Sequence, residues 1–278
     1  MDVPPQGSIS SMANTTIIVV MAIWLTGLAG WAVRDWVKHR RTQLAFIICS
    51  AAVTVYGEAH WDVLIGVQQS TSADALIVYS SFGRDITLWV LLAYMAWVGT
   101  MGYLAFAAIE RGWSAGRLWK LYAGMLAFDL VAEILIVRGG VYSYYGNQPF
   151  RIFGIPFVWP VVHTTAFMIL GFVTHHFFAH FQGIRRLLYL PVVPSTTLGA
   201  VTFVGWPVTS GLGMGLPVPA MTALGMGSTS IAVFLFELMA RCPAARATGT
   251  STPAATTPAP SGRVRAERRR SRGGPGDQ

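Results

Sequence analysis

Two pairs of acidic residues stand inside apolar stretches of the sequence, and both pairs have the same four-residue spacing. Glu58 and Asp62 lie in the segment YGEAHWD, and Asp129 and Glu133 lie in the segment FDLVAE. This spacing places both members of a pair on one face of a helix, about 40° apart. Ionisable groups are costly inside a bilayer, so residues of this kind usually belong to a catalyst, a substrate path or a proton relay.

Carboxyl groups in apolar surroundings can perform acid–base chemistry. One carboxyl group can stay neutral at pH 7 and deliver a proton, while a second, ionised one removes a proton. We expect Asp129 and Glu133 to be the acid and its partner. Glu58 and Asp62 are expected to complete the pair across a cavity.

A histidine and several aromatic residues complete the candidate site. His163 and Tyr145 are predicted to orient the carboxyl groups or to relay protons. Aromatic faces can stabilise a developing positive charge. The residues expected to bind the substrate are Trp61, Tyr142, Tyr144 and Trp159. The site is predicted to need no metal and no cofactor.

Structural roles for the same residues stay open at this point. Asp62 would lie at the membrane interface if its helix ended early, and Asp129 and Glu133 could pair with Arg138 or with hydroxyl groups of a neighbouring helix. A histidine such as His163 often serves packing and hydrogen bonding alone.

The composition predicts the elements that carry these residues. Of the 278 residues, 53% are hydrophobic and only 12% are charged, whereas a soluble domain carries about 25% charged residues. A helix of about 20 apolar residues can span a bilayer. Seven stretches meet this condition, namely 15–33, 42–66, 86–109, 118–137, 157–178, 187–208 and 216–239. The predicted fold is therefore an all-α, polytopic membrane helix bundle with about seven transmembrane helices.

The basic residues predict how the bundle is oriented. Most of the 20 lysine and arginine residues follow the first, third, fifth and seventh stretches. Because positive charge marks the cytoplasmic side, we expect the N-terminus outside and the C-terminus in the cytoplasm. Both acidic pairs, Asp85 and His163 then fall in the outer half of the membrane. The main rival has six spans and a re-entrant segment at 187–208, where Pro191 and Pro194 interrupt the apolar run.

The chain divides into three predicted regions. Residues 1–14 are a short extracytoplasmic N-terminus, 15–242 form the seven-helix membrane domain, and 243–278 form a disordered basic cytoplasmic tail. No cleavable signal peptide is evident. The only lysines, Lys38 and Lys120, lie in cytoplasmic loops, which excludes a retinal-binding lysine in the last span. Much of the net charge of +8 lies in the tail, and this indicates contact with anionic lipid rather than nucleic acid.

Two segments resemble the AveC-like spirocyclase family of bacterial integral membrane proteins. They are DLVAEILIVRGGVYSYYG, from Asp129 to Gly146, and the earlier GEAHWD. The acidic residues are also loosely similar to the functional carboxylates of small membrane-bound terpene cyclases. The resemblance covers about residues 45–180 through short motifs. It implies ring closure on a hydrophobic natural product, with proton transfer at the acidic positions.

We therefore predict a multi-pass protein of the cell membrane that acts as a cyclase or isomerase. It would close a ring in a lipophilic terpenoid or polyketide by carboxylate general acid–base catalysis. One alternative is a proton-coupled transporter or a binding protein for a lipophilic solute. Another is a prenyl-group enzyme whose acidic pairs hold Mg²⁺ against a diphosphate. The expected partners are a lipophilic small-molecule substrate and membrane lipid, without nucleic acid.

Overall fold

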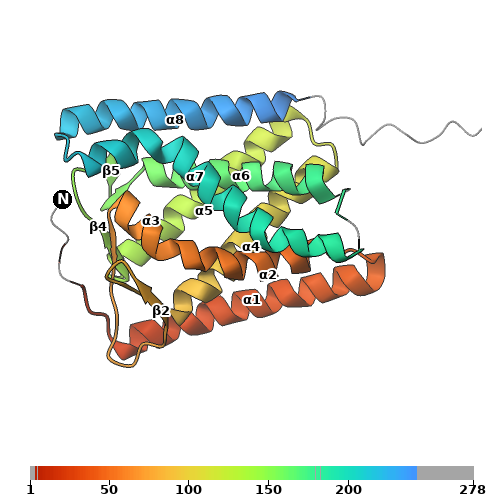
Figure 1. Ribbon diagram of the computed structural model, residues 1–278, viewed down its shortest axis with the longest axis horizontal. Coiled ribbons are helices and arrows are strands. Elements are labelled where there is room, and N and C mark those ends of the chain that lie inside the picture. The colour runs from red at the N-terminus through yellow and green to blue at the C-terminus, as the bar shows by residue number, and fades with distance from the viewer. Residues whose placement is uncertain (1–3, 5, 179, 182, 243–278) are drawn as a thin grey trace, which may run out of the picture.

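The computed structural model describes residues 4, 6–178, 180–181 and 183–242, most of which form helices that lie side by side (Figure 1). The helices are α1 (Ser11–His39), α2 (Gln43–Thr54), α3 (Glu58–Ile65), α4 (Leu88–Glu110), α5 (Ala115–Arg138), α6 (Val158–Phe178), α7 (Tyr189–Gly213) and α8 (Val218–Arg241). Two 3₁₀ segments, η1 (Val55–Gly57) and η2 (Gly183–Leu188), lead into α3 and α7. A helix therefore stands at each of the seven predicted stretches, with α2, η1 and α3 forming the second. The tail predicted for 243–278 lies outside the described residues.

Six segments of the described chain are long and apolar enough to cross a membrane. They are α1, the run Gln43–Ile65, α4, α6, the run Gly183–Gly213 and α8. Helix α5 differs from these because Arg117, Lys120, Asp129 and Glu133 reduce its hydropathy. Its 24 residues would nevertheless extend over about 36 Å. It packs against α6 and α8 in the same bundle.

Three short antiparallel strand pairs correct the all-α prediction. They are β1 (Val67–Gln69) with β4 (Tyr142–Tyr144), β2 (Ile77–Ser81) with β3 (Arg84–Thr87), and β5 (Arg151–Ile152) with β6 (Ile155–Pro156). All three pairs lie at one end of the bundle, on the left in Figure 1. Because these strands have two to five residues, the hydrophobic pattern alone does not reveal them.

The helix predicted for residues 86–109 begins slightly later, because residues 84–87 form β3 and α4 begins at Leu88. A tight turn causes the difference. Phe82 and Gly83 both have positive φ, of 52° and 68°, which is the backbone of a two-residue hairpin.

The predicted break at Pro191 and Pro194 is absent, since α7 is one helix of 25 residues. Pro191 stands in the first turn, where the missing N–H group is not needed. Pro194 and Pro207 are both accommodated inside the helix. A re-entrant segment would require an interruption of the helix here.

Glycines allow the closest helix contacts. A Cβ atom on Gly171 of α6 would lie 2.4 Å from Cβ of Ala105 and 2.6 Å from the backbone nitrogen of Phe106, both in α4. A Cβ atom on Gly57 would lie 2.5 Å from Leu198 of α7. These contacts fix the positions of the α3 segment, α4, α6 and α7, which together surround the site described below.

Replacing Gly171 tests this packing. We expect Gly171→Leu to lower the free energy of unfolding by about 1–3 kcal/mol or more, because the side chain meets backbone atoms that cannot move aside. The matched control is Gly124→Leu in α5, where no atom lies within 4 Å of the added Cβ. Thermal unfolding of both variants in detergent measures the difference. Equal melting temperatures for the two variants would contradict the packing argument.

Candidate functional site

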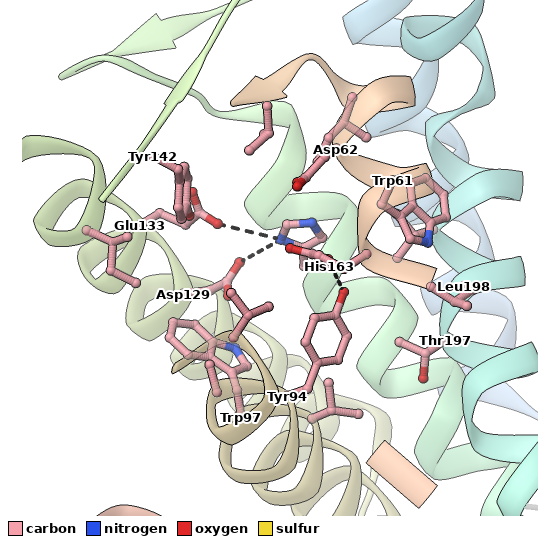
Figure 2. A pocket seen from close by; sticks show the side chains of 18 of the residues that line it. Trp61, Asp62, Tyr94, Trp97, Asp129, Glu133, Tyr142, His163, Thr197 and Leu198 are labelled. Carbon is pink, nitrogen blue, oxygen red and sulfur yellow. Dashed lines mark hydrogen bonds and ion pairs between the residues drawn. The ribbon is translucent and has the colours of Figure 1, made fainter. Parts of the chain in front are cut away.

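A cavity of about 180 Å³ lies among α3, α4, α5, α6 and α7, beside the β1–β4 pair. An engineered apolar cavity of about 150 Å³ is enough to bind benzene, so this cavity has room for a ring-sized part of a ligand. All four predicted carboxyl groups line it, together with His163. The aromatic residues in its wall are Trp61, Trp89, Tyr94, Trp97, Tyr142, Tyr144 and Phe167. We call it the acidic cavity (Figure 2).

One wall of the acidic cavity centres on His163. Its Nδ1 atom lies 3.6 Å from Oδ2 of Asp129 and 4.0 Å from Oε1 of Glu133 (Figure 2). Asp129 and Glu133 are neighbours on α5, as their four-residue spacing predicts, and α6 places the imidazole opposite both. The carboxyl groups are almost fully buried. The basic side chain within ion-pair distance of both is therefore His163, rather than the Arg138 considered from the sequence.

The β1–β4 pair covers this wall. Tyr144 donates a hydrogen bond from its hydroxyl group to Oε2 of Glu133 at 3.0 Å. Burial, and after it the charge of Glu133, raises the pKa of Tyr144 well above its ordinary value, so the hydroxyl group keeps its proton. Alternate residues of a strand share a face. Tyr142 therefore lies on the same side as Tyr144 and also lines the cavity.

The opposite wall contains the other acidic pair. Gln69 of β1 donates from Nε2 to Oε1 of Glu58 at 3.2 Å and to Oδ2 of Asp62 at 3.0 Å. Tyr94 of α4 donates to the second oxygen of Glu58 at 2.5 Å. A single amide group thus connects the two carboxyl groups, and a phenol fixes one of them. This arrangement supplies the hydrogen bonds that buried acidic groups need.

A break between α2 and α3 positions Glu58. The 3₁₀ turn η1 interrupts the helix, and the hydroxyl group of Tyr79 donates to the carbonyl of Val55 at 2.8 Å. The hydroxyl oxygen of Tyr79 also accepts a hydrogen bond from the backbone N–H of Ala59 at 3.2 Å. Glu58 consequently begins α3, where the helix dipole favours a negative charge.

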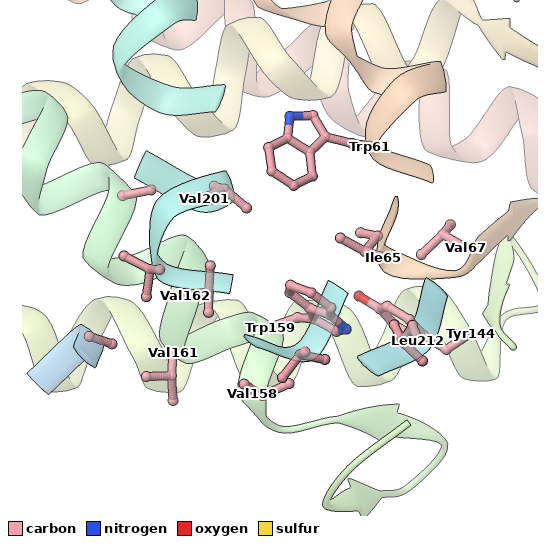
Figure 3. Close-up of a cluster of buried hydrophobic side chains, with 14 of the residues drawn as sticks. Trp61, Ile65, Val67, Tyr144, Val158, Trp159, Val161, Val162, Val201 and Leu212 are labelled. Carbon is pink, nitrogen blue, oxygen red and sulfur yellow. The ribbon is translucent and has the colours of Figure 1, made fainter. Parts of the chain in front are cut away.

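Two predicted site residues lie away from the acidic cavity. Tyr145 accepts a hydrogen bond at 2.8 Å from Nη2 of Arg84, which is buried. It directly follows Tyr144, and successive side chains of an extended segment point to opposite sides. Trp159 is fully buried in the apolar cluster of Figure 3, and its indole N–H donates to Gln148 at 3.1 Å. Neither belongs to the cavity wall.

Sequence reasoning missed Tyr94, Gln69 and Trp97 at this site. Tyr94 and Trp97 lie in the most uniformly apolar span, where aromatic residues resemble ordinary packing residues. A hydroxyl group in the middle of such a span was a signal for Tyr94. Gln69 carries no charge, and only the pairing of β1 with β4 brings it to the carboxyl groups. The other predicted residues, including Trp61 and Tyr142, do line the cavity.

Comparisons of the chain with protein-family models, with curated proteins and with solved structures find no match in any of the three.

Removing the Tyr94 hydroxyl group tests the wall that contains Glu58. We expect Tyr94→Phe to destabilise the protein by about 1–3 kcal/mol, because the part-buried carboxyl group of Glu58 loses a hydrogen-bond donor. Tyr56→Phe is the matched control, since Tyr56 is 65% exposed. Unfolding of both variants, each with and without Glu58→Gln, measures the coupling between the two side chains. Additive effects of Tyr94→Phe and Glu58→Gln would contradict a direct interaction.

Proposed function

We propose that this protein is a membrane-embedded cyclase or isomerase that closes a ring in a lipophilic natural product, a terpenoid or a polyketide. Carboxylate general acid–base catalysis would drive the reaction. The observation that carries the proposal is the convergence of two acidic pairs and His163, from three helices, on one cavity with aromatic walls. The resemblance of the acidic segments to AveC-like spirocyclases points to the same class of reaction.

The two walls have the geometry for proton delivery and proton removal. A protonated carboxyl group on the first wall, Asp129 or Glu133, gives its proton to an oxygen or an alkene carbon of the substrate. The ring bond then forms within the substrate. A carboxylate of the opposite wall, Glu58 or Asp62, removes a proton, so the product is an isomer of the substrate. His163 orients the first pair through its contacts with both carboxyl groups.

The aromatic walls suit the charge that develops during this reaction. Protonation makes the substrate transiently positive, and the faces of Trp61, Trp97 and Tyr94 can stabilise a cation within about 6 Å. The cavity wall, all of it within the described chain, contains no lysine or arginine. Since a diphosphate needs cationic partners, the lining favours an uncharged substrate over the prenyl diphosphate of the Mg²⁺-dependent alternative.

We also propose that all seven helical stretches span the cell membrane, with the N-terminus outside. Helix α5 would be the fourth span, with its acidic residues turned to the cavity instead of the lipid. Basic residues gather at the end of the bundle opposite the strands, for example Arg41 after α1 and Arg241 in the last turn of α8. The acidic cavity would then lie in the outer half of the membrane.

Amide variants test the catalytic proposal. We expect Glu58→Gln, Asp129→Asn and Glu133→Gln each to reduce product formation about 100-fold or more, because an amide cannot exchange the proton. Asp85→Asn serves as the control, since Asp85 contacts Ser80 at the surface of the β2–β3 hairpin. Mass spectrometry of lipid extracts from cells with and without each variant measures product and substrate. Full product from all three amide variants would overturn the assignment.

The same extracts separate the alternatives. A transporter predicts solute movement that depends on the proton gradient, with no change in the mass or structure of the solute. A prenyl-group enzyme predicts that EDTA abolishes product. The proposed cyclase predicts a rearranged product with EDTA present.

Labelling of single cysteines tests the orientation. The first variant carries Cys49→Ser, Cys242→Ser and Ser8→Cys, so its single thiol is at position 8. The second carries Cys49→Ser alone and keeps the native Cys242. We expect a membrane-impermeant thiol reagent to label the first in intact cells, and the second only after permeabilisation. The reverse pattern would contradict an external N-terminus.

A further inference from the structure

The helices around the acidic cavity are tightly packed on most sides. Near α3, a Cβ atom on Gly57 would lie 2.5 Å from Leu198 of α7. Between α6 and α7, a Cβ atom on Gly205 would lie 3.0 Å from Trp159. Helices α4 and α6 are held together at Gly171, and the β1–β4 pair covers the end of the cavity. A ligand larger than a few atoms must therefore enter the acidic cavity from another side.

The side between helices α4 and α5 is packed less closely. They are consecutive in the chain, yet α4 packs along α1, α2 and α6 while α5 packs along α6 and α8. The two helices touch each other in few places. Both nevertheless contribute to the cavity wall, through Trp89, Ala93 and Trp97 of α4 and through Asp129 and Glu133 of α5. The space between them thus borders the cavity directly.

The faces of α5 show which of its sides is free. Leu126, Leu130, Ile134 and Val137 pack into the apolar cluster around α6 and α7. The other side is exposed, with Val131 at 56% and Leu135 at 67%. Ala132 stands between this exposed side and the acidic face, about 60° around the helix from Asp129.

The space between α4 and α5 has small side chains in its middle and large ones at its ends. Ala93 on α4 faces the cavity, and Ala132 is the corresponding small residue on α5. Trp89 and Trp97 lie on either side of Ala93, about 12 Å apart along the axis of α4. Ile136 of α5 packs into the apolar cluster that contains Trp89.

Three aromatic rings close the other end. The ring centroid of Trp97 lies 5.3 Å from that of Phe128 and 5.8 Å from that of Trp24 in α1. Trp24 and Phe128 also meet edge to face at 5.8 Å. The indole N–H of Trp24 donates to Thr100 at 3.1 Å, which fixes this ring. Phe128 is 44% exposed, so the cluster reaches the surface of the bundle.

We propose that the acidic cavity opens sideways into the bilayer through a portal between α4 and α5, framed by Ala93 and Ala132 and bounded by the Trp24–Trp97–Phe128 cluster. Its substrate is accordingly a lipid-dissolved molecule with a slender apolar body and no phosphate group, which enters without passing through water. This inference rests on the proposed function, because it names the substrate class and the route for the same cavity. Access to the portal can, however, be measured without turnover.

A single thiol on the far wall tests the portal. The full chain, carrying Cys49→Ser and Cys242→Ser, receives Val201→Cys on α7, which lines the cavity opposite the portal. In lipid nanodiscs, benzyl methanethiosulfonate, whose apolar part is a single ring, reports access from the bilayer, and a sulfonated methanethiosulfonate reports access from water. We expect the benzyl reagent to react, and Ala132→Trp to slow it about tenfold because the indole fills the opening. Phe128→Ala should speed the reaction because it widens the opening.

The control is Val131→Trp, which introduces the same side chain one position away on the lipid-exposed side. It should leave the rate within about twofold of the parent. Equal slowing by both tryptophan variants, faster reaction of the sulfonated reagent, or no reaction of the benzyl reagent would each overturn the portal. If the labelling pattern holds while Glu58→Gln, Asp129→Asn and Glu133→Gln keep full product, the portal stands and the catalytic proposal fails. The converse result would remove the portal alone.

Discussion

The enclosure of four carboxyl groups among apolar helices, three of them buried, is the constraint on which the arrangement of this protein depends. Such groups are stable inside a bundle only when hydrogen bonds and charged partners surround them. Each partner comes from a different part of the chain: His163 from α6, Tyr94 from α4, Gln69 from β1 and Tyr144 from β4. The requirement therefore brings four elements to one cavity and ties the strands to the helices.

The short strands supply hydrogen-bond partners to these carboxyl groups. The β1–β4 pair places an amide against one acidic pair and a phenol against the other, so a single ribbon connects both walls. The hairpin β2–β3 contributes Tyr79. Its hydroxyl group forms hydrogen bonds with the backbone groups that the break before α3 leaves without helical partners. An isolated two-stranded ribbon has little stability of its own. Here the β1–β4 ribbon is stabilised by its hydrogen bonds to the carboxyl groups of the cavity.

Close helix packing and the proposed portal are compatible because they are located on different sides of the bundle. Glycines such as Gly171 and Gly57 let backbones approach on the α3, α4, α6 and α7 sides. Between α4 and α5, beside the cavity, the ring of Trp97 meets that of Phe128 instead. Rings can rotate aside at less cost than a backbone can move, so this side is suited to admitting a lipophilic molecule.

The sequence alone determined the helices, because each apolar stretch is long and can be recognised from neighbouring residues in the chain. It also determined that Asp129 and Glu133 share a face, since a spacing of four residues fixes that on any helix. The partners of these groups were decided by the tertiary structure. Gln69 and Tyr94 are uncharged, and Tyr145 differs from Tyr144 only in the direction given by the strand register. Such choices depend on contacts between residues far apart in the chain, and the spacing of residues along a single sequence does not specify these contacts.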